Sequence, residues 1–154
     1  MSRFFKDTQS QNIFQEFITV ADTTAVPELT ELTANTTDAT QEKHVPVVTI
    51  KENLIEVSVG SVAHPMLEEH YITGIYIETK YGFQFKKLAP GDEPKAEFLL
   101  TDGDEFIAAY EYCNLHGLWK TLPGGELFFR ICIPALFMNL PSYSAAFYYA
   151  LPGE

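Results

Sequence analysis

The sequence is poor in cysteine and in basic side chains, and each shortage excludes a class of protein. Two cysteines in 154 residues cannot form the disulfide framework of a small secreted domain. Ten basic residues against 21 acidic ones give a net charge of -11, which argues against binding to nucleic acid or to an anionic membrane. The chain opens without a basic segment followed by an apolar one, so we expect no signal peptide and a cytoplasmic protein.

The first 40 residues show no signal for a helix of normal length, and residues 23–40 are interpreted as loop and linker. Short β-type runs are frequent, by contrast. Apolar, β-branched and aromatic residues alternate or cluster at 53–59, 71–79, 83–88, 96–100 and 106–112. Shorter runs at 4–6 and 12–20 could also be strands. This pattern predicts an all-β protein built as an antiparallel sandwich or barrel.

The last part of the chain lacks charge. Residues 131–153 carry no charged side chain, which reaches the ~20 residues that a membrane-spanning helix needs. Pro134, Pro141 and Pro152 would break such a helix. We therefore interpret residues 122–154 as an apolar C-terminal extension of unknown role, with a membrane span as the less favoured alternative. Cys132 has no His or Cys neighbour and is interpreted as structural.

All four histidines and one cysteine lie in segments that flank predicted strands. His44 precedes one strand, His64 and His70 share one connection, and Cys113 and His116 form a Cys-x-x-His pair in another. Loops at one end of a sandwich lie close together, so the three segments could converge on one ion. Thiolate and imidazole are ligands that transition metals prefer. Five such ligands fit a square pyramid with one open position, which suits iron better than tetrahedral zinc.

Five segments of this chain are long and distinctive: EKHVPV at 42–47, GSVAHPM at 60–66, EHYI at 69–72, LAPGDEP at 88–94 and YCNLHGLW at 112–119. In this order they resemble the superoxide reductases, which are the desulfoferrodoxin and neelaredoxin family. The resemblance covers about residues 36–120 and implies an immunoglobulin-like antiparallel β-sandwich. It implies one mononuclear iron per chain, with the ligands His44, His64, His70, His116 and Cys113. The implied reaction is one-electron reduction of superoxide to hydrogen peroxide, without release of oxygen.

The Glu-Lys-His part of this resemblance also implies roles for two charged residues. Lys43, beside the metal, would attract superoxide and orient a water molecule for protonation. Glu42 would reach the open position once the iron is oxidised and would leave it on re-reduction.

Residues 1–38 resemble a small N-terminal domain that binds a second iron through four cysteines in some relatives. Asp7 and Ser10 stand where its first two cysteines would be, and no cysteine pair occurs near Val26 and Pro27. We therefore expect a metal-free N-terminal β segment, no second rubredoxin-type iron, and an iron-binding sandwich at 39–121. The resemblance also implies an external electron donor such as rubredoxin, and a homodimer.

Two alternatives without catalysis stay open. An electron-transfer cupredoxin uses two histidines, one cysteine and a weak axial methionine, but no methionine follows His116 within its loop. A binding module with structural zinc would leave the Glu42-Lys43 pair and the fifth ligand without a role. Metal content and the response to superoxide distinguish these three classes of protein.

Overall fold

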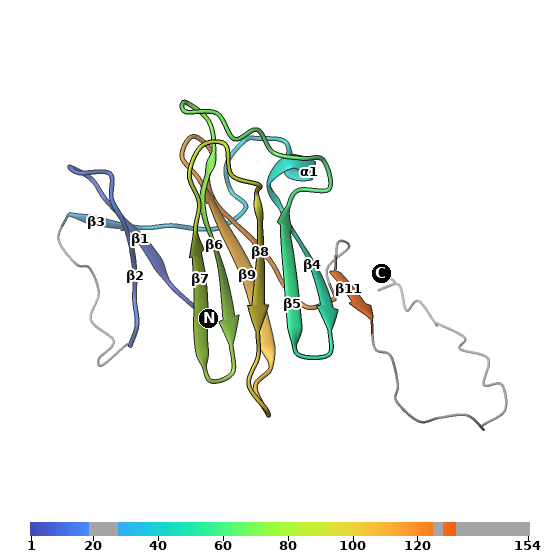
Figure 1. Cartoon of the computed structure of the whole chain (residues 1–154). Helices are drawn as coiled ribbons and strands as arrows, with labels where there is room; N and C mark the ends of the chain where they lie inside the picture. The colour runs from blue at the N-terminus through green and yellow to red at the C-terminus, as the bar shows by residue number, and fades with distance from the viewer. Residues whose placement is uncertain (19–27, 125–127, 132–154) are drawn as a thin grey trace, which may run out of the picture.

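The computed structural model describes residues 1–18, 28–124 and 128–131, and nearly all of its elements are strands (Figure 1). A three-stranded sheet, in the order β2-β1-β3, consists of β1 (Phe4–Asp7), β2 (Ile13–Gln15) and β3 (Leu29–Glu31). One helical turn, α1 (Gln41–His44), leads into the larger part of the fold. That part consists of β4 (Pro46–Lys51), β5 (Leu54–Val59), β6 (Ile72–Thr79), β7 (Gly82–Lys87), β8 (Lys95–Leu99), β9 (Phe106–Cys113), β10 (Gly117–Thr121) and β11 (Phe128–Ile131).

These eight strands form two four-stranded sheets, in the orders β10-β9-β6-β7 and β11-β4-β5-β8. All of their pairings are antiparallel except that of β11, which runs parallel to β4 at the edge of its sheet. The alternation in β5 puts Ile55, Val57 and Val59 on the buried face, as expected. The two sheets enclose one core, in which these residues pack with Ile75 and Ile77 of the facing sheet. The predicted all-β sandwich is confirmed.

The central strands β6 and β9 are buried on both faces, because the N-terminal sheet covers part of their outer face. Phe4 of β1 packs there against Tyr76 and Tyr110, with ring centroids 5.3 and 5.1 Å apart. The hydroxyl of Tyr76 also bonds the hydroxyl of Ser2, just before β1, at 2.9 Å. The N-terminal segment is therefore joined to the sandwich by an aromatic cluster of its own.

Four elements differ from the sequence interpretation. Strand β3 lies within the stretch interpreted as loop, because its backbone pairs with β1 although the sequence Leu-Thr-Glu is short and polar. Strands β10 and β11 and the single turn α1 were not predicted. The division into residues 1–38, 39–121 and 122–154 stays a prediction.

The described residues contain no helix that is long and apolar enough to cross a bilayer. The interpretations placed on residues 132–154, including the membrane alternative and the structural role of Cys132, lie outside the described residues.

Candidate metal centre

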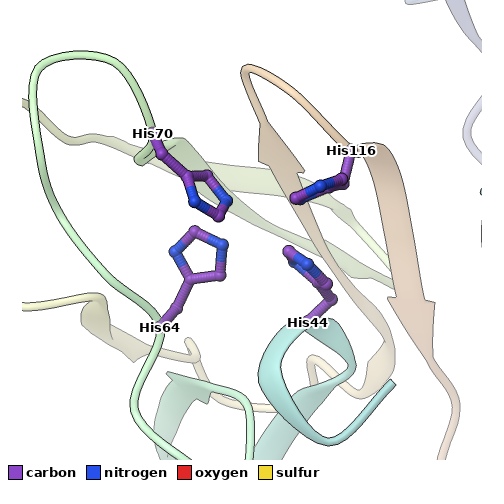
Figure 2. A group of neighbouring side chains, drawn as sticks. All are labelled: His44, His64, His70 and His116. Carbon is purple, nitrogen blue, oxygen red and sulfur yellow. The ribbon is translucent and has the colours of Figure 1, made fainter. Parts of the chain in front are cut away.

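The four histidines meet at one end of the sandwich (Figure 2). His44 is the last residue of α1, and His64 and His70 lie in the connection between β5 and β6. His116 lies in the turn between β9 and β10, three residues after Cys113, which ends β9. One ligand nitrogen from each ring lies within 4.8 Å of all the others. The structure thus brings together three segments that are distant in sequence, as the spacing of the histidines predicts.

The sulfur of Cys113 lies beside this cluster. It is 3.7 Å from Nε2 of His64 and 3.6 Å from Nδ1 of His116. The other ring nitrogen of His64, Nδ1, lies 2.6 Å from the carbonyl oxygen of Pro65 and is therefore the nitrogen that carries the proton. This leaves the lone pair of Nε2 facing the centre. Nε2 of His70 is buried without a hydrogen-bond partner among the described residues.

The surroundings keep these imidazoles neutral, which is the form that binds metal. Burial, reinforced by the charges of the neighbouring histidines and Lys43, lowers the pKa of His44 to about 4. Burial also lowers the pKa of His64 to about 4, and that of His70 below its ordinary value. The imidazoles of these three residues are consequently neutral at pH 7, as metal coordination requires. The unpartnered Nε2 of His70 and the nearby sulfur complete a donor set that fits one transition-metal ion.

The turn after Cys113 supports its sulfur. Backbone N–H groups of His116 and Leu115 donate hydrogen bonds to the sulfur and favour the thiolate, although burial has the larger effect and raises the pKa of the thiol in the metal-free protein. Gly117 closes the turn at a φ of 74°, and its backbone pairs with that of Cys113. A bound cation would remove the proton, since coordination deprotonates a thiol.

Asn114 ties two of the three segments together. Its Oδ1 accepts a hydrogen bond from the backbone N–H of Tyr71 at 2.9 Å, and its Nδ2 donates to the carbonyl of Glu69 at 3.0 Å. These two residues flank His70, whose backbone also forms an antiparallel bridge with Leu67. Asn114 therefore sets the distance between the His70 segment and the Cys113 turn. Sequence reasoning missed this role, although the residue lies inside the Cys-x-x-His pair.

Trp119 is a second supporting residue that the sequence interpretation missed. Its ring stacks on that of His44, with centroids 4.9 Å apart and an interplanar angle of 15°. Its Nε1–H donates a hydrogen bond to the carbonyl of His116 at 3.1 Å. One buried side chain on β10 thus touches two members of the histidine cluster. A third missed residue, Glu111, faces His44, with its Oε1 3.6 Å from Nδ1 of the ring.

Glu42 and Lys43 lie on α1, directly before His44, and both are exposed. The charge of Lys43 contributes to lowering the pKa values of His44, His64 and His70, so its ammonium group adds positive potential to the cluster. The backbone carbonyl of Glu42 accepts a hydrogen bond from the N–H of Val62 at 3.0 Å. This bond fixes α1 to the connection that carries His64. The structure thus places both residues on α1 next to His44 in sequence, exposed to solvent, and only Lys43 acts on the pKa values of the cluster.

The N-terminal sheet has a carboxylate where the resemblance calls for a thiolate. Oδ1 of Asp7 accepts hydrogen bonds from the backbone N–H groups of Gln9 and Ser10, at 2.8 and 2.7 Å. The Ser10 bond and then the Gln9 bond lower the pKa of the Asp7 carboxyl. The side chain of Asp7 therefore closes the turn between β1 and β2. The region near Val26 and Pro27 lies outside the described residues.

Comparison with known proteins gives a consistent answer. The sequence model of the family described as Desulfoferrodoxin matches residues 36–122. A desulfoferrodoxin homolog from Archaeoglobus fulgidus is 50% identical over 86 residues, which are 56% of this chain and 67% of the relative. A superoxide reductase from Pyrococcus horikoshii is 37% identical over 97 residues, which cover 51% of this chain and 84% of that protein.

A solved structure extends this likeness to the fold. The superoxide reductase from Treponema pallidum superimposes with a TM-score of 0.65 at 37% identity, covering 77% of this chain and 98% of that one. The structural likeness therefore reaches beyond the residues that the family model matches. The resemblance stated from the sequence motifs is confirmed. The chain, with its histidine cluster, its cysteine and its β-sandwich, belongs to the desulfoferrodoxin family.

Proposed function

We propose that this protein is a superoxide reductase that uses one mononuclear iron per chain. The ligands are the five residues of the predicted set: His44, His64, His70, His116 and Cys113. The observation that carries the proposal is the meeting of one nitrogen from each of four imidazoles within 4.8 Å, with the Cys113 sulfur 3.6 and 3.7 Å from two of these rings. Structural zinc sites use four ligands, so a set of five donors would fit iron better than zinc.

Iron, when bound, supplies the single electron that reduces superoxide, which with two protons becomes hydrogen peroxide. The residues of the chain bring in the anion and the protons. The net charge of -11 repels superoxide at long range, so a local positive charge has to attract it at the site. Lys43 supplies that charge, and at ~4 Å a unit pair is worth roughly 1 kcal/mol in water and about 4 kcal/mol at an effective dielectric constant of 20. Its ammonium group also orients the water that delivers a proton.

Glu42 precedes Lys43 on the exposed side of α1. We propose that Glu42 is the residue whose carboxylate would bind the iron of the oxidised protein and would be released from it on reduction. The electron comes from an external protein donor such as rubredoxin, because two cysteines in the sequence cannot build a second, four-cysteine iron centre. The cytoplasm, where such donors are reduced, is the proposed location.

The test of the reaction combines metal analysis with two variants. We expect one iron per chain and a thiolate charge-transfer band in the oxidised protein, which Cys113→Ser abolishes. Lys43→Ala should retain its iron and its band but react more slowly with superoxide. Lys51→Ala is the matched control, because Lys51 is also exposed but lies at the far end of β4, paired with Glu56. Stoichiometric zinc, or release of oxygen during turnover, would contradict the proposal.

A homodimer is also proposed, and an exposed aromatic groove supports it. The groove, with a cavity of about 310 Å³, lies between the N-terminal sheet and the outer face of β6 and β7. Phe14, Phe83 and Phe85 line it and are 46%, 40% and 59% exposed. Contiguous exposed aromatic surface of this kind is typical of interfaces. Phe85→Lys should therefore shift sedimentation toward the monomer, whereas Leu99→Lys, an exposed leucine of the other sheet, should leave it unchanged.

A further inference from the structure

Glu111 is a buried carboxyl group next to the candidate metal centre, and the proposed reaction gives it no task. It lies on β9, two residues before Cys113, and its side chain has no exposed surface. Neither of its carboxyl oxygens has a hydrogen-bond partner among the described residues. Buried polar groups are nearly always paired, so an unpaired carboxyl in the interior of a sandwich calls for an explanation.

The nearest complementary group belongs to His44. Nδ1 of His44 is also buried without a hydrogen-bond partner among the described residues, and it lies 3.6 Å from Oε1 of Glu111. A hydrogen bond between nitrogen and oxygen needs about 2.7–3.2 Å, so a shift of a few tenths of an ångström closes it. Trp119, the cross-strand neighbour of Glu111, stacks on the ring of His44 and restricts its rotation. A ring nitrogen that can donate a hydrogen bond thus faces a carboxyl oxygen that can accept it, and both lack another partner among the described residues.

His64 shows what such a partner does. Its Nδ1 is paired with the carbonyl oxygen of Pro65, and its Nε2 is thereby directed to the Cys113 sulfur. Histidine ligands generally donate their second N–H to a carboxylate or carbonyl, which fixes the tautomer and makes the imidazole a stronger donor. We propose that Glu111 is the positioning residue for His44: it accepts the Nδ1–H of His44 and keeps Nε2 directed at the metal. This inference rests on the metal site of the proposed function, and adds to it the carboxyl group that supports one ligand.

For Glu111→Leu, we expect metal affinity to fall while the stability of the metal-free protein does not. In the metal-free protein the variant replaces an unpaired buried carboxyl by an apolar side chain of similar size, so thermal stability should stay equal or increase. Affinity for Co²⁺ or Zn²⁺ should fall by about 10–100-fold, the usual loss when the partner of a histidine ligand is removed. The midpoint potential of the iron-loaded protein should rise, because a weaker imidazole donor stabilises the oxidised ion less. Glu111→Gln retains an accepting oxygen and should lose less affinity.

The experiment measures Co²⁺ and Zn²⁺ affinity by competition with a chelator, together with the melting temperature of the metal-free protein. Glu78→Gln is the control, because Glu78 is a shielded glutamate on the neighbouring strand whose partners are Tyr110 and Ser2. Unchanged affinity and potential in Glu111→Leu would overturn the proposal. A melting temperature that falls together with affinity would also overturn it, since Glu111 would then only support the fold. Neither metal assay depends on superoxide, so the proposed reaction could fail while this inference stands.

Discussion

Gly60 lies where α1 touches the β5–β6 connection, and replacing it with alanine should damage both the fold and the metal centre. Its φ is 76°, a conformation that costs an L residue about 1–2 kcal/mol. A Cβ at this position would lie 2.6 Å from the carbonyl oxygen of Val62 and 2.7 Å from that of Glu42. Both are backbone atoms, so the two segments would have to move apart by several tenths of an ångström.

That movement weakens two hydrogen bonds, from Gly60 N–H to Val45 O at 3.2 Å and from Val62 N–H to Glu42 O at 3.0 Å. Each is worth about 0.5–1.5 kcal/mol. Gly60→Ala should therefore lower the free energy of unfolding by about 2–5 kcal/mol, a large share of the stability of a domain of this size. The same movement separates His44 from His64, whose ring centroids are 4.7 Å apart. Metal affinity should accordingly fall at least about tenfold, as it does when supporting contacts are lost.

Gly91→Ala is the matched control for the strain alone. Gly91 has a φ of 86°, but a Cβ there would meet nothing within 4 Å. Urea unfolding of the two metal-free variants should therefore show a loss of about 1–2 kcal/mol for Gly91→Ala and a clearly larger loss for Gly60→Ala. Co²⁺ titration should show a defect in Gly60→Ala only. Equal losses in both variants would refute the argument from backbone contact.

Three further predictions concern the histidines of the metal-free protein and the N-terminal sheet. The pKa values of His44 and His64 fall from 6.5 in the unfolded chain to about 4 in the folded protein. Between these pH values the unfolded chain therefore binds more protons than the folded protein. The urea midpoint of the metal-free protein should fall as the pH is lowered from about 6.5 to 4. Phe4→Ala should cost about 3–5 kcal/mol in the same assay, because Phe4 is buried at the junction of the N-terminal sheet and the sandwich. Asp7→Ala should speed amide hydrogen exchange at Gln9 while the iron content stays the same, since its carboxyl holds only the local turn.

Local pattern was enough to predict most strands of the sandwich and to single out the five candidate donors. Alternation marks β5 because one of its faces is buried, and the Cys113-His116 spacing is short enough to be set by a single turn. The meeting of His44 with His64 could be expected from the rule that connections at one end of a sandwich lie together. The supporting residues could not be predicted in this way. Glu111 is a charged residue within a predicted strand, and its burial beside His44 depends on α1, which is distant in the sequence.

Strand β3 also could not be predicted from local sequence. Leu29, Thr30 and Glu31 have neither the length nor the composition of a strand, and they form one because β1 offers a free edge. Trp119 is similar, since its sequence neighbours identify it as part of a motif but do not reveal that its ring stacks on His44. Residues whose role depends on a distant partner are thus the ones that sequence reasoning misses here.

The connection between β5 and β6 is the structural centre of the candidate site. It carries two of the four histidines, it touches α1 through the close backbone approach at Gly60, and it is tied to the Cys113 turn by Asn114. None of these contacts involves a metal, so the donors are brought together by the fold itself. Burial keeps the imidazoles of His44 and His64 neutral at pH 7, whereas it raises the pKa of the Cys113 thiol. As a proposed ligand, Cys113 would have to give up a proton when metal enters, and the N–H groups of Leu115 and His116 are already in place to stabilise the resulting thiolate.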